Sequence, residues 1–231
     1  MRRLLFSPLT LPLFILFLIL LPILLILFAG TIAGAFSKLG IPSTVAYTLF
    51  FASLLGSFIN IPVGEIRSLV PVLRIREVTV FGITYPIPYV DVGEGRTVVA
   101  VNLGGALIPL SVSLYIIGRA AAEYNVALLL RLALSVVVAS LIVHSFSRPV
   151  RGMGIAVPFF IPPLTAVSLA MLFDVNRPAV AYISGTLGTL IGADLMNWNK
   201  FKELGAPMVS IGGAGTFDGV FLAGIVAVLL V

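Results

Sequence analysis

The chain has 231 residues, of which 60% are hydrophobic and only 10% charged. Soluble domains carry about a quarter charged residues, so this composition excludes a soluble domain and a disordered chain. Nucleic-acid binding is also excluded as a main role, although the net charge is +5. The absence of cysteine and the single histidine, His144, exclude disulfides, thiolate chemistry and an ordinary zinc site. The sequence therefore predicts a polytopic protein of the lipid bilayer, with no metal and no cofactor.

Seven apolar stretches are long enough to cross a bilayer, which takes about 20 helical residues. Charged residues, glycines and prolines bound these stretches. In chain order, the predicted spans are 9–30, 44–63, 98–117, 124–143, 154–173, 179–197 and 208–231. The first follows Met1-Arg2-Arg3 and is too long for the core of a signal peptide, so we predict that it is a retained helix.

Lysine and arginine are distributed unequally over the predicted loops. With an inside N-terminus and seven crossings, ten of these residues fall on the inner side. Only Lys38, Arg119 and Arg177 fall on the outer side, and Arg131 lies within the fourth span. Because cytoplasmic loops are enriched in Lys and Arg, the bias predicts a cytoplasmic N-terminus and an outside C-terminus in the cell membrane.

Residues 74–101 do not fit a helix. They are rich in β-branched and aromatic residues and contain Pro86, Pro88 and the turn-like Gly93-Glu94-Gly95. We predict a small cytoplasmic β-hairpin between the second and third helices, with or without a third short strand. The predicted fold is thus an all-α membrane protein, a single domain of about seven transmembrane helices with this β-rich insertion. The hairpin either caps the bundle or offers a sheet edge to an extended peptide.

Two of the nine acidic residues, Asp194 and Asp218, fall inside predicted spans. An ionisable side chain is costly in a membrane, so each marks a functional-site hypothesis. Asp194 lies near the inner end of the sixth span and Asp218 in the inner half of the seventh. Gly212, Gly213 and Gly215 interrupt that last helix just before Asp218. We expect the two carboxylates to reach a similar depth on consecutive antiparallel helices.

Two carboxylates a few ångströms apart in a low-dielectric site do not ionise together readily. One then serves as an acid and the other as a base, which is the condition for activating water against a peptide carbonyl. Asp194 and Asp218 are therefore the predicted catalytic residues. The small residues beside them, Gly192, Gly213 and Gly215, are predicted to border the substrate. As an alternative, each aspartate caps exposed backbone at a glycine-broken helix end.

The second half of the chain, residues 102–231, resembles an uncharacterised family of archaeal and bacterial polytopic membrane proteins. The resemblance lies in Gly192-Ala193-Asp194-Leu195 and Gly213-Ala214-Gly215-Thr216-Phe217-Asp218-Gly219. The same residues are similar to the GxGD intramembrane aspartyl proteases, the presenilin and signal peptide peptidase group, whose two aspartates lie on the sixth and seventh helices. This similarity implies an endopeptidase acting on a transmembrane peptide or protein substrate. Three features depart from the group: Thr216 and Phe217 precede Asp218, no tyrosine precedes Asp194, and there is no ninth helix with a Pro-Ala-Leu motif.

Three prolines, Pro158, Pro162 and Pro163, lie at the start of the fifth span and predict a kinked or unwound helix. Pro162, Pro163 and Leu164 are predicted to support a substrate, as Pro-Ala-Leu does in the proteases; a purely structural kink is the alternative. Similar breaks at Asn102 and Pro109 are typical of the half-helices of transporter sites.

Three functions stay open at this point. The first is the aspartyl protease. The second is a cation- or proton-coupled transporter or channel that binds its ion at the same aspartates between broken helices. The third is a non-catalytic scaffold or chaperone. The sequence identifies neither the substrate nor the oligomeric state.

Overall fold

The computed structural model describes residues 10–80, 83–123, 125–213 and 219–231. The chain divides into two compact units, Met1–Phe50 and Phe51–Val231. Among these described residues, four helices are long and apolar enough to cross a membrane: Phe14–Lys38, Leu103–Ala122, Val126–Phe146 and Arg177–Glu203. Three shorter apolar helices are Ser43–Gly56, Ile161–Phe173 and Gly219–Leu230. The described part of the chain is therefore mostly helical, and its helices indicate a membrane protein.

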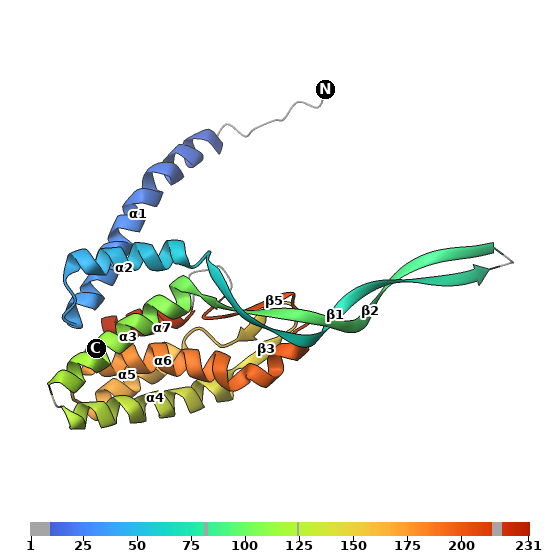
Figure 1. Cartoon of the computed structure of the whole chain (residues 1–231). Helices are drawn as coiled ribbons and strands as arrows, with labels where there is room; N and C mark the ends of the chain where they lie inside the picture. Colours follow the sequence, from blue (N-terminus) through green and yellow to red (C-terminus); the bar gives the residue numbers. More distant parts are fainter. Residues whose placement is uncertain (1–9, 81–82, 124, 214–218) are drawn as a thin grey trace. The chain divides into compact units, whose positions relative to one another are not determined.

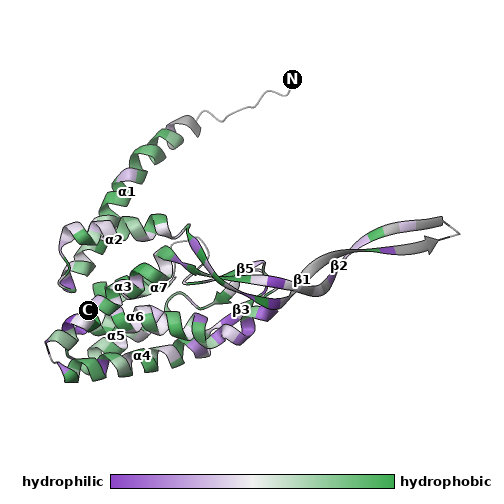
Figure 2. Cartoon of the chain, in the orientation of Figure 1, coloured by the Kyte–Doolittle hydropathy of each residue, from purple (hydrophilic) through white to green (hydrophobic). Residues whose placement is uncertain are grey.

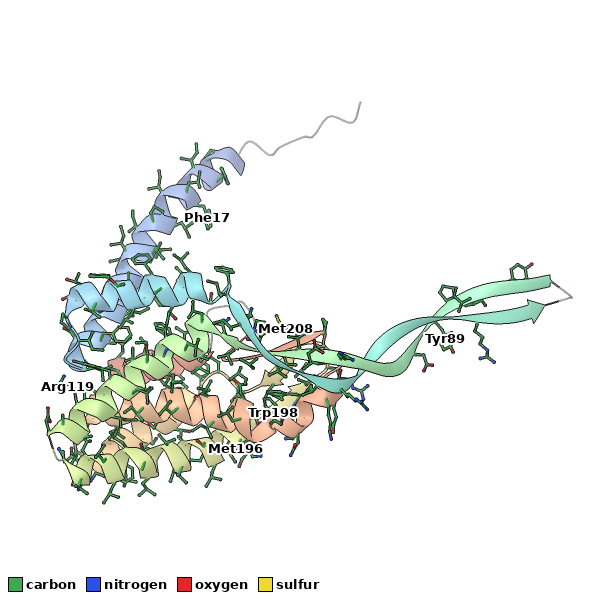
Figure 3. The ribbon with its side chains drawn as sticks, viewed as in Figure 1. Phe17, Tyr89, Arg119, Met196, Trp198 and Met208 are labelled. Carbon is green, nitrogen blue, oxygen red and sulfur yellow. The ribbon has the colours of Figure 1, made fainter. Side chains whose placement is uncertain are left out.

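The first unit consists of helix α1 (Thr10–Lys38) and the beginning of helix α2 (Ser43–Gly56). The large side chains from Phe14 to Phe28 are exposed, and Phe17 illustrates them in Figure 3. Beyond them the helix has a buried face that includes Ile32 and Phe36. The exposed Phe28 ring meets the buried Phe50 ring of α2 edge to face, at 6.0 Å between centroids. Gly40 adopts a positive φ of 75° in the turn between the two helices, a conformation that glycine adopts without strain.

A long antiparallel ribbon lies between α2 and α3 in the second unit. Its strands are β1 (Asn60–Val80) and β2 (Ile83–Asn102), paired along their lengths with one bulge between Pro62 and Gly64. The ribbon spans 60–102 and not 74–101. It therefore includes the last residues of the predicted second span and the first residues of the predicted third span. Apolar β-branched residues satisfy a strand as readily as a helix, which is why hydropathy did not separate them here.

A third strand, β5 (Met208–Ile211), pairs in parallel with β2 from Val98 to Val101 and gives the sheet order β1-β2-β5. Side-chain hydrogen bonds fix this strand: Ser210 Oγ donates to Asn60 Oδ1 at 2.6 Å, and Thr97 Oγ1 donates to the Ala206 carbonyl at 2.6 Å. These groups are buried or half-buried, and they find their hydrogen-bond partners inside the protein, as burial requires. They hold the C-terminal strand against the base of the ribbon.

The remaining helices form the main body of the second unit (Figure 1). They are a π-helical turn at Leu103–Leu107, α3 (Ile108–Ala122), α4 (Val126–Phe146), α5 (Ile161–Phe173), α6 (Arg177–Thr189) and α7 (Gly219–Leu230). Helix α6 packs against α4, α5 and α7. Gly185 lies against the backbone of Ala223 in α7, a close approach that a small residue permits. Figure 2 shows these helices as mostly hydrophobic.

A short hairpin, β3 (Arg148–Val150) and β4 (Gly154–Ala156), separates α4 from α5. The predicted fifth span therefore starts as a strand, and its helix begins only at Ile161. Pro162 and Pro163 lie in the first turn of α5, where a missing N–H costs no hydrogen bond. These prolines begin the helix and do not kink its interior.

Candidate functional site

The sixth helix changes its winding at the position of Asp194. Regular α-helix ends at Thr189, a π-helical turn covers Leu190–Asp194, and a 3₁₀ segment, Leu195–Glu203, continues the chain. A π-turn followed by a 3₁₀ segment shifts the hydrogen-bond pattern and frees main-chain carbonyls at the junction, a feature frequent at functional sites. Asp194 is the last residue of the π-turn.

Asp194 is joined to the end of strand β5 by a direct hydrogen bond. The Gly212 N–H donates to Asp194 Oδ2 at 2.7 Å. Gly212 has a φ of 79°, and a Cβ there would lie 2.7 Å from the Ala106 nitrogen, so only glycine fits. The bond fixes the orientation of the carboxylate and ties the break in the sixth helix to the segment that leads toward Asp218.

Asn197 holds the broken helix in place. Its side chain is fully buried, and Nδ2 donates to the carbonyls of Gly192 and Ala193 at 3.1 and 2.8 Å and to Ser147 Oγ at 2.7 Å. His144 Nδ1 lies 3.3 Å from the same Gly192 carbonyl. In the sequence, Asn197 is only the last residue of a predicted span. Its signal was an amide side chain one turn beyond a glycine-rich helix end, where freed carbonyls need donors.

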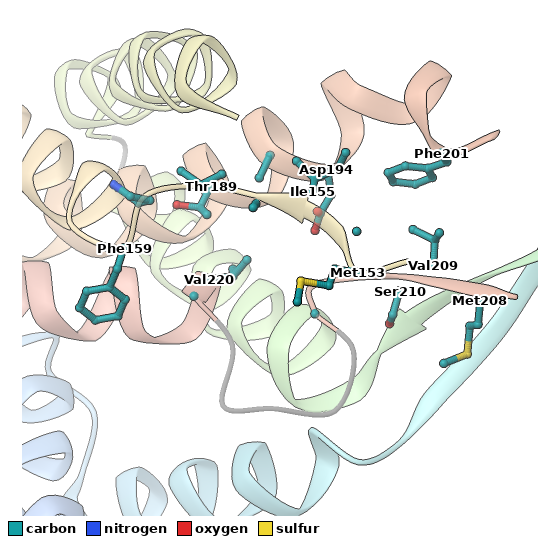
Figure 4. Close-up of a pocket in the computed structure, with 17 residues that line it drawn as sticks. Met153, Ile155, Phe159, Thr189, Asp194, Phe201, Met208, Val209, Ser210 and Val220 are labelled. Atoms are coloured by element: carbon teal, nitrogen blue, oxygen red, sulfur yellow. The ribbon is translucent and has the colours of Figure 1, made fainter. Parts of the chain in front are cut away.

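A cavity of about 310 Å³ opens beside Asp194 (Figure 4). Its walls come from the β4 hairpin, the start of α5, the end of the sixth helix, strand β5 and the start of α7. The lining residues are Met153, Gly154, Ile155, Ala156, Val157, Phe159, Pro162, Thr189, Ala193, Asp194, Phe201, Met208, Val209, Ser210, Gly213, Gly219 and Val220. Most of them are apolar. Asp194 supplies the one ionisable group among these lining residues, and Thr189 and Ser210 supply hydroxyls.

Three of the residues predicted from the sequence line this cavity: Asp194, Gly213 and Pro162. Asp218 and Gly215 lie outside the described residues. The described residues on either side of that stretch, Gly213 and Gly219, both line the cavity.

The other predicted residues have structural roles or face elsewhere. Gly192 is buried against α4, where an added Cβ would overlap the Ser140 carbonyl oxygen, so close helix packing explains this glycine. Pro163 is buried in the first turn of α5, and Leu164 is exposed. None of these three residues belongs to the cavity lining.

Metal ligation is not evident in the part of the chain that the structure describes. No group of three or more His, Asp or Glu side chains comes together there in a way that could hold an ion. The site is thus a carboxylate in a mostly apolar cavity, positioned by a main-chain donor and flanked by two hydroxyls.

An apolar cavity that contains a carboxylate and is lined in part by the membrane-length segment Arg177–Glu203 defines a membrane protein with an internal site. The chain belongs to the family described as protein of unknown function (DUF1614), whose profile matches residues 54–230. No curated protein and no solved structure matches the chain. The family agrees with the uncharacterised membrane-protein family predicted from the sequence. It has no assigned activity, so the activity has to follow from the chemistry of the site.

Proposed function

We propose that the protein is an intramembrane aspartyl protease that hydrolyses a peptide bond of a membrane-spanning substrate near the cytoplasmic face. Asp194 and Asp218 are its two carboxylates. The observation that carries the proposal is the cavity: Asp194 lines it, and so does Gly219, the residue that follows Asp218 in the chain. Two carboxylates on consecutive segments beside one apolar cavity are what water activation requires.

The reaction needs one ionised and one protonated carboxyl group. The ionised carboxylate takes a proton from water while the water oxygen attacks the peptide carbonyl carbon, and the protonated partner gives its proton to the carbonyl oxygen. The intermediate, which carries two hydroxyls, then collapses as the C–N bond breaks. The carboxyl group that took the proton from water gives it to the leaving amine, and one hydroxyl of the intermediate returns its proton to the other carboxylate, so the starting pair is restored. The apolar walls favour this division of roles, because low dielectric makes a second negative charge costly.

The two hydroxyls of the cavity do not compete with water as nucleophiles. Thr189 Oγ1 donates its proton to the Gly185 carbonyl at 2.5 Å, and Ser210 Oγ donates to Asn60 Oδ1 at 2.6 Å. Both protons are therefore engaged in bonds within the protein, and no described histidine lies beside them in the cavity lining. The site supports carboxylate chemistry better than serine or threonine chemistry.

As part of the same proposal, the chain crosses the membrane seven times, and its N-terminus and the ribbon lie on the cytoplasmic side. Helices α5 and α7 have 13 and 12 residues, which is short for a bilayer. Before each of them, extended chain lines the cavity, at β4 and at β5. Non-helical backbone is tolerated at membrane depth where it is buried in protein or lines a cavity. Each short helix with its extended lead-in makes one crossing.

Transport at the same aspartates is the competing function, and the helix break argues against it. An ion site between broken helices uses freed main-chain carbonyls as ligands. Here the carbonyls of Gly192 and Ala193 already accept from the Asn197 side chain. One lone pair of each carbonyl oxygen is therefore already used in holding the helix.

The test is cleavage of a single-span reporter protein in proteoliposomes by purified full-length protein. Asp194→Asn and Asp218→Asn should each lower the cleavage rate by at least about 10³-fold, because paired catalytic groups act as a unit. Asp174→Asn is the matched control, since Asp174 is exposed and hydrogen-bonds Arg177 outside the cavity. The thermal unfolding midpoints of all three variants should stay near that of the wild type. Unchanged cleavage in Asp194→Asn or in Asp218→Asn would reject the proposal. Ion flux that depends on these two carboxylates, without any proteolysis, would reject it as well.

A further inference from the structure

The edge of strand β2 that faces away from β1 is covered along only part of its length. Strand β5 pairs with it at Val98–Val101, and among the described strands no other pairs with this edge. A two-stranded ribbon is marginally stable in water by itself, and a third strand adds to its stability. The part of β2 before Val98 therefore has an edge that no described strand covers.

The direction of the free main-chain groups follows from one hydrogen bond. The Val98 N–H donates to the Pro207 carbonyl at 3.0 Å, so this N–H faces away from β1. Because successive residues of a strand alternate, the N–H groups of Arg96, Glu94, Val92 and Val90 face the same way. The next two positions of this row are Pro88 and Pro86, which have no N–H. The edge thus offers four successive donors and ends at Pro88.

The row of outward-facing N–H groups lies on the same edge of β2 as strand β5, which lines the cavity. β5 is an extended segment of the chain itself seated on the same edge, and its residues Met208, Val209 and Ser210 line the cavity. A further strand bound at 90–96 would lie in line with β5. The corresponding row on β1 is interrupted by Pro71, which faces Val92 in the register, and β2 separates that row from β5.

We propose that residues 90–96 of β2 dock an extended segment of the substrate, the flank that follows its membrane span on the cytoplasmic side. The inference rests on the proposed function and names the class of substrate for the same site. Binding is by strand addition, so main-chain hydrogen bonds supply affinity with little demand on sequence. Seven residues of strand cover about 23 Å. The preferred flank is extended, rich in β-branched residues and free of proline.

The experiment measures binding without cleavage, in full-length protein that carries Asp194→Asn and Asp218→Asn. The probe is a synthetic peptide with a leucine-rich span of about 20 residues and a flank of alternating valine and threonine. Hydrogen exchange with the probe bound should slow at the amides of 90, 92, 94 and 96 by about tenfold or more. The amides of 91, 93 and 95 should not change, because they already face β1.

A matched pair of proline variants tests the edge by affinity. Val90 and Leu73 face each other in the register, and each N–H points outward from the ribbon. Val90→Pro removes a donor from the β2 edge and should weaken probe binding about five- to tenfold, as loss of one hydrogen bond implies. Leu73→Pro removes the equivalent donor from the β1 edge and should leave binding unchanged.

The outcomes separate the docking edge from the catalytic proposal. Alternating protection together with the Val90→Pro effect supports the edge even if the active protein cleaves nothing. Equal effects of the two proline variants, or no protection on binding, would overturn the docking edge while leaving the aspartates untouched. Protection of the same amides without probe, rising with protein concentration, would assign the edge to a second copy of the chain and overturn it as well.

Discussion

Helix α1 and the sixth helix, Arg177–Glu203, which begins with α6, both have the length and composition of membrane helices, yet they bury very different fractions of their residues. In Phe14–Lys38 the most apolar window is 11% buried, whereas in Arg177–Glu203 it is 72% buried. The less apolar of the two is thus the one enclosed by protein. High hydropathy marks the surface that lipid can solvate, and small and hydroxyl residues mark the surface that other helices cover.

The surroundings of the glycines in the two helices explain this difference in burial. On α6, added Cβ atoms at Gly185 and Gly188 meet Ala223 and Ala139. On α1, added Cβ atoms at Gly30 and Gly34 meet nothing within 4 Å. The same residue type therefore serves close packing in one helix and no contact in the other, and substitutions can test this difference.

The largest expected effect is at the helix break. Gly192→Ala would bring a Cβ against the Ser140 carbonyl oxygen and to 3.0 Å from Ser140 Cα, both parts of the α4 backbone. We expect a loss of about 3 kcal/mol in unfolding free energy, since backbone cannot move aside cheaply. Thermal unfolding in detergent micelles measures it. Gly118→Ala in α3, with open space around the glycine, is the control; equal midpoints for the two variants would contradict close packing.

A smaller loss is expected when the bracing amide is removed. Asn197→Ala deletes three hydrogen bonds and leaves the carbonyls of Gly192 and Ala193 without this donor. We expect about 2 kcal/mol of destabilisation, together with slower cleavage because Asp194 lies next to these carbonyls. Asn199→Ala, at an exposed position of the same 3₁₀ segment, should change stability by less than about 0.5 kcal/mol. A similar cost for both variants would show that Asn197 does not hold the break.

The smallest effect is expected in α1. Gly30→Ala fills open space and replaces the poorest helix former apart from proline, so it should stabilise the helix by about 0.5 to 1 kcal/mol. Unfolding midpoints at several protein concentrations are the measurement. A clear loss of stability would mean that another surface covers this face, and the contrast with α6 would then fail.

Composition and hydropathy predicted the helical segments better than their ends. They located an apolar stretch at each of the helices α1 to α7, yet the predicted fifth and seventh spans began at 154 and 208, before the helices themselves begin. The structure has strands at Gly154–Ala156 and Met208–Ile211 instead. Hydropathy averaged over about 20 residues does not separate a short helix from a strand followed by a helix, because both are apolar.

The site was predicted in part, and the missing part depends on contacts distant in sequence. Asp194 stood out because a carboxylate in an apolar stretch is rare. Its partner Gly212 is 18 residues away, and the bracing contact of Asn197 with Ser147 spans 50 residues. Periodicity and composition report local preference, so neither contact was visible from them.

The sequence by itself determined that this is an apolar, mostly helical membrane chain with a β-rich insertion and two acidic residues in unusual surroundings. These properties follow from composition and local pattern, because apolar segments partition into lipid and polar segments into water whatever the tertiary contacts are. Only the tertiary structure decided that β5 joins the ribbon, that the sixth helix breaks at Asp194, and which glycines serve packing. Those features arise where distant segments exclude water from each other, and each backbone group must then find its partner inside the protein.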